Sequence, residues 1–381
     1  MKLFFVLTCF LACAFAAHAQ TSETSLPAPT PTPAPAPVKE ETLQFSGDFR
    51  YRHQVETQGS KEQRTVERIQ ARFGVASQLQ DNFLVKLRLM TGSAANSGNQ
   101  TLGDSSAPGM PRRNFGLDQA YFDYQPLAGL NLYGGKMPQP FTFAGKNQLL
   151  LDRDISPEGG ALKYSVSLME ELKYFVQGGS FLLREKYNTT GGKEQTDNLL
   201  NALQTGVQWK PEDWTVLVGV GSFAYIGLKN TPPGNLVTGS NGNGNTLDGS
   251  GNYASEYNIE EMFFELQKKV GAVDLTLFAE GVRNREATTL NRATSYGVLA
   301  AYKAWSFSLS QQEVEKDAVV GVFTDSDFGG GVTSSRGQVW TAGYKLTKKI
   351  AAQLTVFKNQ TAIDTTPQKY DRANLDLMAS F

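Results

Sequence analysis

The sequence predicts an all-β fold, a transmembrane antiparallel β-barrel of about sixteen strands with short periplasmic turns and long extracellular loops. Three observations predict it. Polarity alternates residue by residue along most of the chain, short and long connections follow one another in turn, and the last segment is amphipathic and ends in Phe381. After residue 19 no apolar run approaches the roughly 20 residues of a membrane helix. Any segment that spans a membrane is therefore expected to be a strand.

The alternation is clearest in segments of about ten to fifteen residues that begin at Leu43. In one of them the serines alternate with large apolar residues: Trp305, Ser306, Phe307, Ser308, Leu309, Ser310. Period two gives a strand one apolar and one polar face. In a barrel the apolar face meets lipid and the polar face meets water, and closure leaves no unpaired strand edge in hydrocarbon.

The connections between these segments divide into two kinds. Tight ones fall near residues 80–82, 125–129, 169–171, 210–213, 269–273, 303–305 and 347–350. Longer ones fall at residues 91–113, 138–157, 186–197, 229–254 and 317–335. If the first strand starts in the periplasm, every long connection lies on the outer side. A soluble β-sandwich, the alternative class, gives no reason for this segregation.

The first residues resemble a secretory leader. Lys2 precedes an apolar run over 3–16, and Ala17 and Ala19 are small residues at the expected cleavage site. We therefore predict a signal peptide over 1–19, because the run is too short for a comfortable membrane anchor. Export and cleavage would direct the mature chain to the outer membrane of a Gram-negative cell.

A proline-rich stretch follows the leader, and the chain beyond the leader has few reactive residues. Residues 20–42 are predicted to be an extended periplasmic spacer, since alternate prolines fix the backbone and remove donors. Both cysteines, Cys9 and Cys13, and His18 lie in the leader, which leaves His53 as the one histidine of the expected mature chain. We predict no catalytic, metal-binding or cofactor-binding residues. With 36 basic and 37 acidic residues, no nucleic-acid partner is indicated.

Basic residues of the first three predicted strands share one parity of the alternation. A cation on the lipid face at mid-membrane costs about 2–4 kcal/mol, so we expect them to point into the lumen as a basic wall. A modest anion preference follows, although acidic residues are also expected to line the lumen. The predicted wall comprises Arg50, Arg52, Arg68, Arg72, Lys86 and Arg88.

The connection over residues 139–157 is unusual because it is rich in apolar side chains such as Phe141, Phe143 and Leu149. We predict that it folds into the barrel and narrows the pore. The alternative is an outer loop over the mouth or against a neighbouring subunit. Opposed charges across a narrow wet passage make a transverse field that selects solutes. The charged residues expected in this constriction are Lys146, Asp152, Arg153, Asp154 and Glu158.

Two stretches carry a family resemblance. FGLDQAYFDYQPLAGLNLYGGKMPQPF at 115–141 and LLLDRDISPEGGALKY at 149–164 resemble the Gram-negative outer-membrane family of putative porins, although Leu151 stands where that family often has tryptophan. The resemblance implies a single-chain barrel of the general porin type for small hydrophilic solutes. It also implies a homotrimer. The expected partners are outer-membrane lipid, lipopolysaccharide and, through Phe381, the barrel-assembly machinery.

Two other functions compete with passive diffusion. A substrate-specific channel would have the same strand pattern, and the alternation does not distinguish it from a general porin. A barrel enzyme would need a nucleophile and base held together. Because His53 has no serine nucleophile motif around it, we predict that the chain is not an enzyme.

Overall fold

The computed structural model describes residues 43–92, 96–106, 108–186 and 197–381. The predicted signal peptide (1–19) and spacer (20–42) lie outside them. No helix in these ranges is long and apolar enough to cross a membrane.

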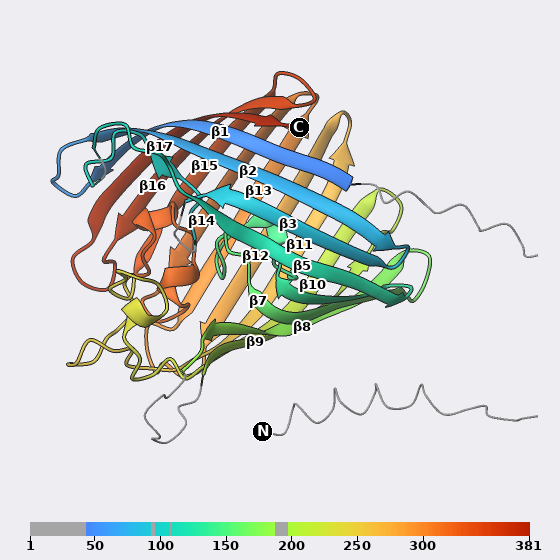
Figure 1. The fold of residues 1–381 in the computed structure, drawn as a ribbon, viewed down its shortest axis with the longest axis horizontal. Coiled ribbons are helices and arrows are strands. Elements are labelled where there is room, and N and C mark those ends of the chain that lie inside the picture. Colours follow the sequence, from blue (N-terminus) through green and yellow to red (C-terminus); the bar gives the residue numbers. More distant parts are fainter. Residues whose placement is uncertain (1–42, 93–95, 107, 187–196) are drawn as a thin grey trace, which may run out of the picture. The chain divides into compact units, whose positions relative to one another are not determined.

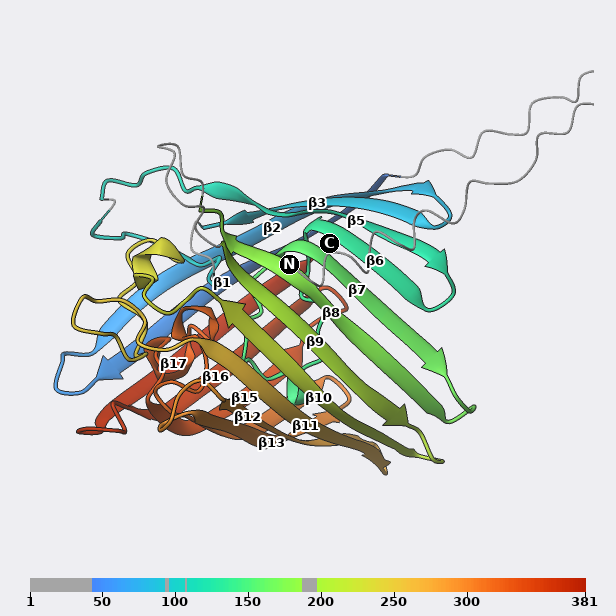
Figure 2. The ribbon, with the colours of Figure 1, turned by 90° about the horizontal axis from the view of Figure 1, so that it is seen from below.

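Sixteen long strands make up the wall within the described residues, and Figures 1 and 2 show them side by side. The first eight are β1 (Leu43–Gln58), β2 (Arg64–Gln80), β3 (Phe83–Thr91), β5 (Phe115–Leu127), β6 (Leu130–Lys136), β7 (Glu158–Ser167), β8 (Leu172–Arg184) and β9 (Asn198–Trp209). The others are β10 (Trp214–Ile226), β11 (Tyr257–Val270), β12 (Val273–Asn284), β13 (Arg292–Tyr302), β14 (Trp305–Val314), β15 (Ser335–Lys345), β16 (Ile350–Thr361) and β17 (Gln368–Ser380). The two-residue β4 (Gln100–Thr101) pairs with β2 inside a loop.

The strands close into a ring. Each long strand pairs antiparallel with the next, and β1 pairs with β17 from Asp48↔Ser380 to Gln58↔Tyr370. Backbone hydrogen bonds between Gly47 and Phe381 extend this seam by one more step. No edge strand remains in the wall, and the predicted barrel class is confirmed.

The two ends of the ring differ. At one end the turns are short: residues 81–82, 128–129, 168–171, 210–213, 271–272, 303–304 and 346–349. At the other end lie loops 137–157, 227–256 and 315–334 and the described parts of 92–114 and 185–197, with shorter loops at 59–63, 285–291 and 362–367. We call these the turn end and the loop end. In outer-membrane barrels the short turns are periplasmic and the long loops extracellular.

The two faces of each strand differ as the alternation requires. On β11, Met262 is 66% exposed on the outer face, whereas its neighbours Glu261 and Phe263 are buried on the inner face. At the turn end the outer face carries aromatic residues in contact, such as Trp305 and Tyr344 with ring centroids 4.5 Å apart. Aromatic belts of this kind lie at membrane–water boundaries.

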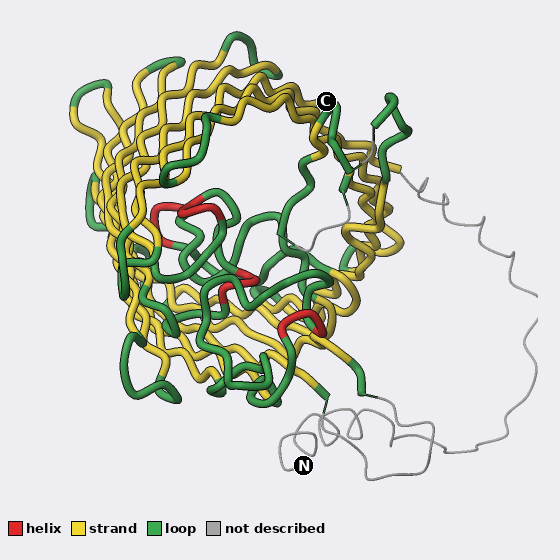
Figure 3. The backbone as a smooth tube through the Cα atoms, turned by 90° about the vertical axis from the view of Figure 1, so that its left-hand side faces the viewer, coloured by secondary structure: helices red, strands yellow, loops and turns green. Residues whose placement is uncertain are grey.

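The largest buried cluster lies inside the ring. Figure 3 shows the barrel end-on, with loops and short 3₁₀ helices inside the ring of strands. A sixteen-stranded wall is too wide for strand side chains to fill. Apolar loop residues therefore pack on inward residues of the wall, as Leu149 and Val319 do beside Phe181 and Phe223.

The orientation of the strands predicts the effect of a charge placed on either face. Leu277 on β12 is half-exposed on the outer face, and Thr276 beside it points inward. Leu277→Arg should lower the free energy of unfolding by about 2–4 kcal/mol, because the cation would enter hydrocarbon. Thr276→Arg, with the cation in the lumen, should change it far less. Denaturant titration of both variants refolded in lipid vesicles measures this; equal losses would contradict the assigned faces.

Candidate functional site

Loop 137–157 follows the inner wall away from its own strands. A hydrogen bond of 2.9 Å from the Met137 amide to the Pro157 carbonyl closes its base. The ring of Phe141 then packs against those of Phe181 on β8 and Phe223 on β10, at 6.0 and 5.0 Å between centroids. These aromatic contacts attach the first arm of the loop to the wall.

The tip of the loop reaches β11 and β12. It contains the short helix η1 (Ala144–Lys146). The Gly145 amide donates to Glu265 at 2.6 Å, and the Asn147 side chain donates to Glu280 at 2.5 Å. Gly145 has φ +59°, and an added Cβ would lie 2.2 Å from the ring of Phe278, so glycine is required here.

The returning arm meets a second inward loop, 315–334, which contains η3 (Gly321–Phe323) and η4 (Phe328–Gly330). The Asp152 amide donates to the Phe323 carbonyl at 2.7 Å. In return, the Ser326 amide donates to Asp152 Oδ2 at 2.8 Å. The Thr324 hydroxyl also donates to the Leu149 carbonyl at 3.0 Å. The two loops therefore form one hydrogen-bonded unit.

Asp327 fixes the second loop to the wall. Its carboxylate lies 2.8 Å from Arg52 on β1 and 3.0 Å from Arg372 on β17. Arg52 also pairs with Asp376 at 2.7 Å. Burial disfavours ionisation of Asp327, but Arg372 and Arg52 outweigh it and lower its pKa to about 2. This carboxylate stays charged over the physiological range.

Asp152 is in the opposite situation. Its carboxylate is buried and accepts hydrogen bonds from the amides of Asp154 and Ser326, but no cation pairs with it among the described residues. Burial, and then the nearby Asp325, raise its pKa to about 7. Burial and Asp327 likewise raise the pKa of Asp325 to about 6. The contact between the two loops thus contains carboxyl groups that take up protons near neutrality.

The six cations of the predicted basic wall lie on β1, β2 and β3, and they differ in their partners. Arg52, Arg72 and Arg88 are paired with carboxylates: Arg72 with Asp48 at 2.9 Å, and Arg88 with Asp118. Register places Arg68 directly opposite Arg52.

The remaining three cations have no carboxylate within ion-pair distance in the described part of the chain. Arg50 donates to the side chain of Asn99 at 2.7 Å. Lys86 is half-buried on β3, and Arg68 is half-buried on β2. Positive charge that is not neutralised locally therefore concentrates around Arg50 and Arg68.

The five charged residues expected in the constriction are not all brought together. Asp154 lies 3.9 Å from Arg72 and accepts from Gln70 at 3.0 Å. Asp152 faces loop 315–334 instead. Lys146 and Arg153 are exposed, and the Arg153 guanidinium donates to the Lys146 carbonyl. Glu158 starts β7, where it pairs with Lys136 at 2.6 Å rather than meeting the basic wall.

Residues 317–335 were predicted only as a long outer connection, whereas loop 315–334 folds inward. Its signal was present in the run AVVGVF at residues 318–323, which is as apolar as the middle of loop 137–157. These residues are buried in the structure. An apolar run in a long loop of a barrel is therefore a general indication that the loop folds inward.

A closed ring of sixteen amphipathic strands, apolar outside and polar inside, is the architecture of an outer-membrane β-barrel pore. Comparison with known proteins gives the same result. The family model described as "Putative porin" matches residues 46–248 and 252–381. The chain belongs to this porin family, and the predicted family resemblance is confirmed. The family and fold are those of a channel in the outer membrane rather than of an enzyme.

Solved porin structures share the fold at low sequence identity. Salmonella typhi OmpF in complex with daunomycin is 13% identical, with a TM-score of 0.53 over 90% of this chain and 98% of that chain. Pseudomonas putida OprB, in a high-pH structure, is also 13% identical, with a TM-score of 0.57 over 89% of this chain and 94% of that one. No curated protein matches the sequence.

The ion pairs of Asp327 predict that this residue and its neighbour Asp325 contribute differently to the free energy of unfolding. Asp327→Asn should lower the free energy of unfolding by about 2 kcal/mol at pH 7, because the charged guanidinium of Arg372 loses its nearest hydrogen-bonded carboxylate. The lowered pKa of Asp327 means that its contribution is present above the unfolded value of about 3.9 and is lost as pH falls towards 2. Denaturant titration at pH 7 and pH 2 measures both effects.

Asp325→Asn is the matched control. The raised pKa of Asp325 means that its ionised form is disfavoured in the fold, so its removal should not destabilise the protein at pH 7. Equal destabilisation by the two variants would contradict the role given to Asp327.

Proposed function

We propose that the chain is a passive diffusion pore for small hydrophilic solutes and ions, narrowed by loop 137–157 and weakly selective for anions. One observation supports it most: within a closed barrel, this loop hydrogen-bonds to opposite parts of the wall. Its tip contacts Glu280 on β12, and its returning arm contacts Gln70 on β2. A segment that joins these strands reduces the cross-section available to a solute.

The chemistry of the lining fits passive passage. Several contacts between loop and wall are polar, as in the hydrogen bond of 2.8 Å from the Thr142 amide to Gln204. Polar walls replace part of a solute's hydration without binding it tightly. The apolar contacts of Phe141 and Leu149 lie beneath this surface and hold the loop in place.

The distribution of charge supports a transverse field and a weak anion preference. Among the described residues, Arg50 on β1 and Arg68 on β2 have no carboxylate within ion-pair distance, whereas the half-buried Glu265 lies on β11. Positive charge on one wall and negative charge on the other orient water between them. The preference is weak because Asp48, Asp118 and Asp376 neutralise much of the basic wall.

We infer the remaining partners from the outer surface. Phe381 is 64% exposed at the end of the last outward face, where the barrel-assembly machinery would contact it. The exposed apolar outer face would contact outer-membrane lipid, with lipopolysaccharide at the loop end. We also propose that the chain assembles into a homotrimer. The ring of His53 lies 2.6 Å from the carboxylate of Glu67. Both residues alternate with the inward Arg52 and Arg68, so neither faces the lumen.

Deleting residues 141–154 should raise the single-channel conductance by about two-fold or more, since the narrowest section would widen. Planar-bilayer recordings of the refolded protein measure this. Deleting residues 60–62, which are exposed in the short loop 59–63, is the control and should leave conductance unchanged. An unchanged conductance after the larger deletion would falsify the constriction.

Arg68→Glu should shift selectivity towards cations, because it changes the local charge by two elementary units at a position where no described carboxylate lies within ion-pair distance. The reversal potential in a salt gradient reports the change. Lys61→Glu makes the same change at an exposed loop tip and should leave the reversal potential nearly constant. Equal shifts in both variants would refute a luminal role for Arg68.

A further inference from the structure

The outer face of the barrel carries an apolar groove of about 300 Å³ across β13 to β16. Ala300 and Ala342 form its floor. Phe307, Trp340 and Leu354 rise beside them. A trough exists here because two small side chains interrupt a surface made of large ones.

The register explains where the groove lies. Ala300 pairs with Phe307, Phe307 pairs with Ala342, and Ala342 pairs with Leu354, so small and large side chains alternate along one row across four strands. The next outward row towards the turns contains Tyr302, Trp305 and Tyr344. These exposed aromatic residues mark the boundary between hydrocarbon and headgroups. The groove therefore begins just inside the hydrocarbon.

Three lysines lie in the adjoining turns, Lys303, Lys348 and Lys349, and a fourth, Lys345, is the last residue of β15. All four are exposed. The ammonium group of Lys303 lies 5.0 Å from the ring centre of Tyr302, which places it beside the aromatic row. None of the four pairs with a carboxylate within the described residues. The end of the groove is thus strongly positive.

We propose that this groove and its lysines form a binding site for an anionic phospholipid of the periplasmic leaflet. The acyl chains would lie over Ala300 and Ala342, on either side of Phe307. The phosphate would lie at the level of Tyr302 and Trp305, within reach of the flexible lysine side chains. Lysines near a membrane surface attract anionic headgroups. Two features with different chemistry, a hydrocarbon trough and a cationic rim, thus adjoin each other.

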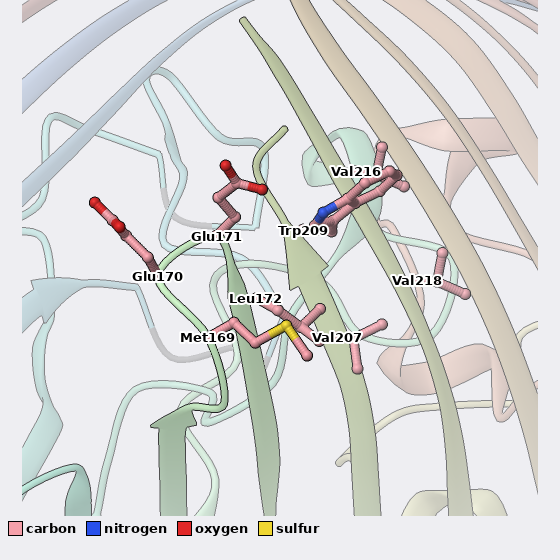
Figure 4. Close-up of a pocket in the computed structure, with 8 residues that line it drawn as sticks. All are labelled: Met169, Glu170, Glu171, Leu172, Val207, Trp209, Val216 and Val218. Atoms are coloured by element: carbon pink, nitrogen blue, oxygen red, sulfur yellow. The ribbon is translucent and has the colours of Figure 1, made fainter. Parts of the chain in front are cut away.

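A second groove on the same barrel provides a comparison. It has a volume of about 480 Å³, lies across β8 to β10, and is lined by residues such as Val207, Trp209 and Val218. Figure 4 shows Glu170 and Glu171 in the turn beside it. An acidic rim repels an anionic headgroup, so shape alone would not give this groove the same ligand. The charge at the rim distinguishes the two sites.

The test uses the full chain folded in detergent, with native mass spectrometry to count retained lipids. The probes are phosphatidylglycerol and phosphatidylcholine with identical acyl chains. The wild-type protein should retain phosphatidylglycerol with a preference of about five-fold or more, as expected for attraction of an anionic headgroup by clustered lysines. Equal retention of the two lipids would overturn the proposal.

Variants separate the headgroup from the acyl chain. The quadruple variant Lys303→Gln, Lys345→Gln, Lys348→Gln, Lys349→Gln should abolish the preference for phosphatidylglycerol. Ala300→Trp with Ala342→Trp, which fills the groove but keeps the lysines, should reduce retention of the bound lipid. A preserved preference in the first variant, or unchanged retention in the second, contradicts the site.

Val218→Trp fills the second groove and is the matched control. It should leave retention of phosphatidylglycerol unchanged. A loss as large as that of the Ala300 and Ala342 variant would show that apolar surface in general, rather than the lysine-rimmed groove, holds the lipid. Single-channel conductance of each variant in a planar bilayer verifies that the barrel has folded.

Discussion

The structure depends on one constraint, which is that no backbone N–H or C=O group of the wall can be left unpaired in hydrocarbon. The seam between β1 and β17 satisfies this constraint through eleven paired positions, from Asp48 to Gln58 on β1. Because the chain must return to its first strand, both described ends of the wall come together. The final backbone hydrogen bonds, between Phe381 and Gly47, complete the ring at its turn end.

Closure with this many strands creates a second requirement. The ring is wider than its inward side chains can fill, so apolar loop segments supply the missing core. Leu149 and Val319 are buried in that core, although both belong to loops. The backbone groups of these loops need partners too, and inward polar residues such as Gln204 and Glu265 supply them. The residues that stabilise the interior and those that would narrow the passage are therefore the same.

Much of this could be predicted from the sequence because its rules are local. Period two places Arg52 and Arg72 on one face without knowledge of any partner. The contacts across the ring are not local. Arg52 meets Asp327, which is 275 positions further along the chain, and no periodicity connects them. The position of Glu158, in contrast, follows from a local rule. It lies opposite Lys136 and away from the basic wall, and the alternation of polarity along β7 already contains this information.

The two inward loops are held by interactions that respond oppositely to acid. Asp327 keeps its charge between two arginines, so its contribution is lost only as pH falls towards 2. Asp152 pairs with no cation in the described part of the chain, and its pKa of about 7 lies above the value of about 3.9 in an unfolded chain. Its stabilising contribution is complete below the unfolded value and is lost as pH rises through 7. The attachment of loop 315–334 to the wall is thus insensitive to neutral pH, whereas its contact with loop 137–157 weakens as Asp152 ionises.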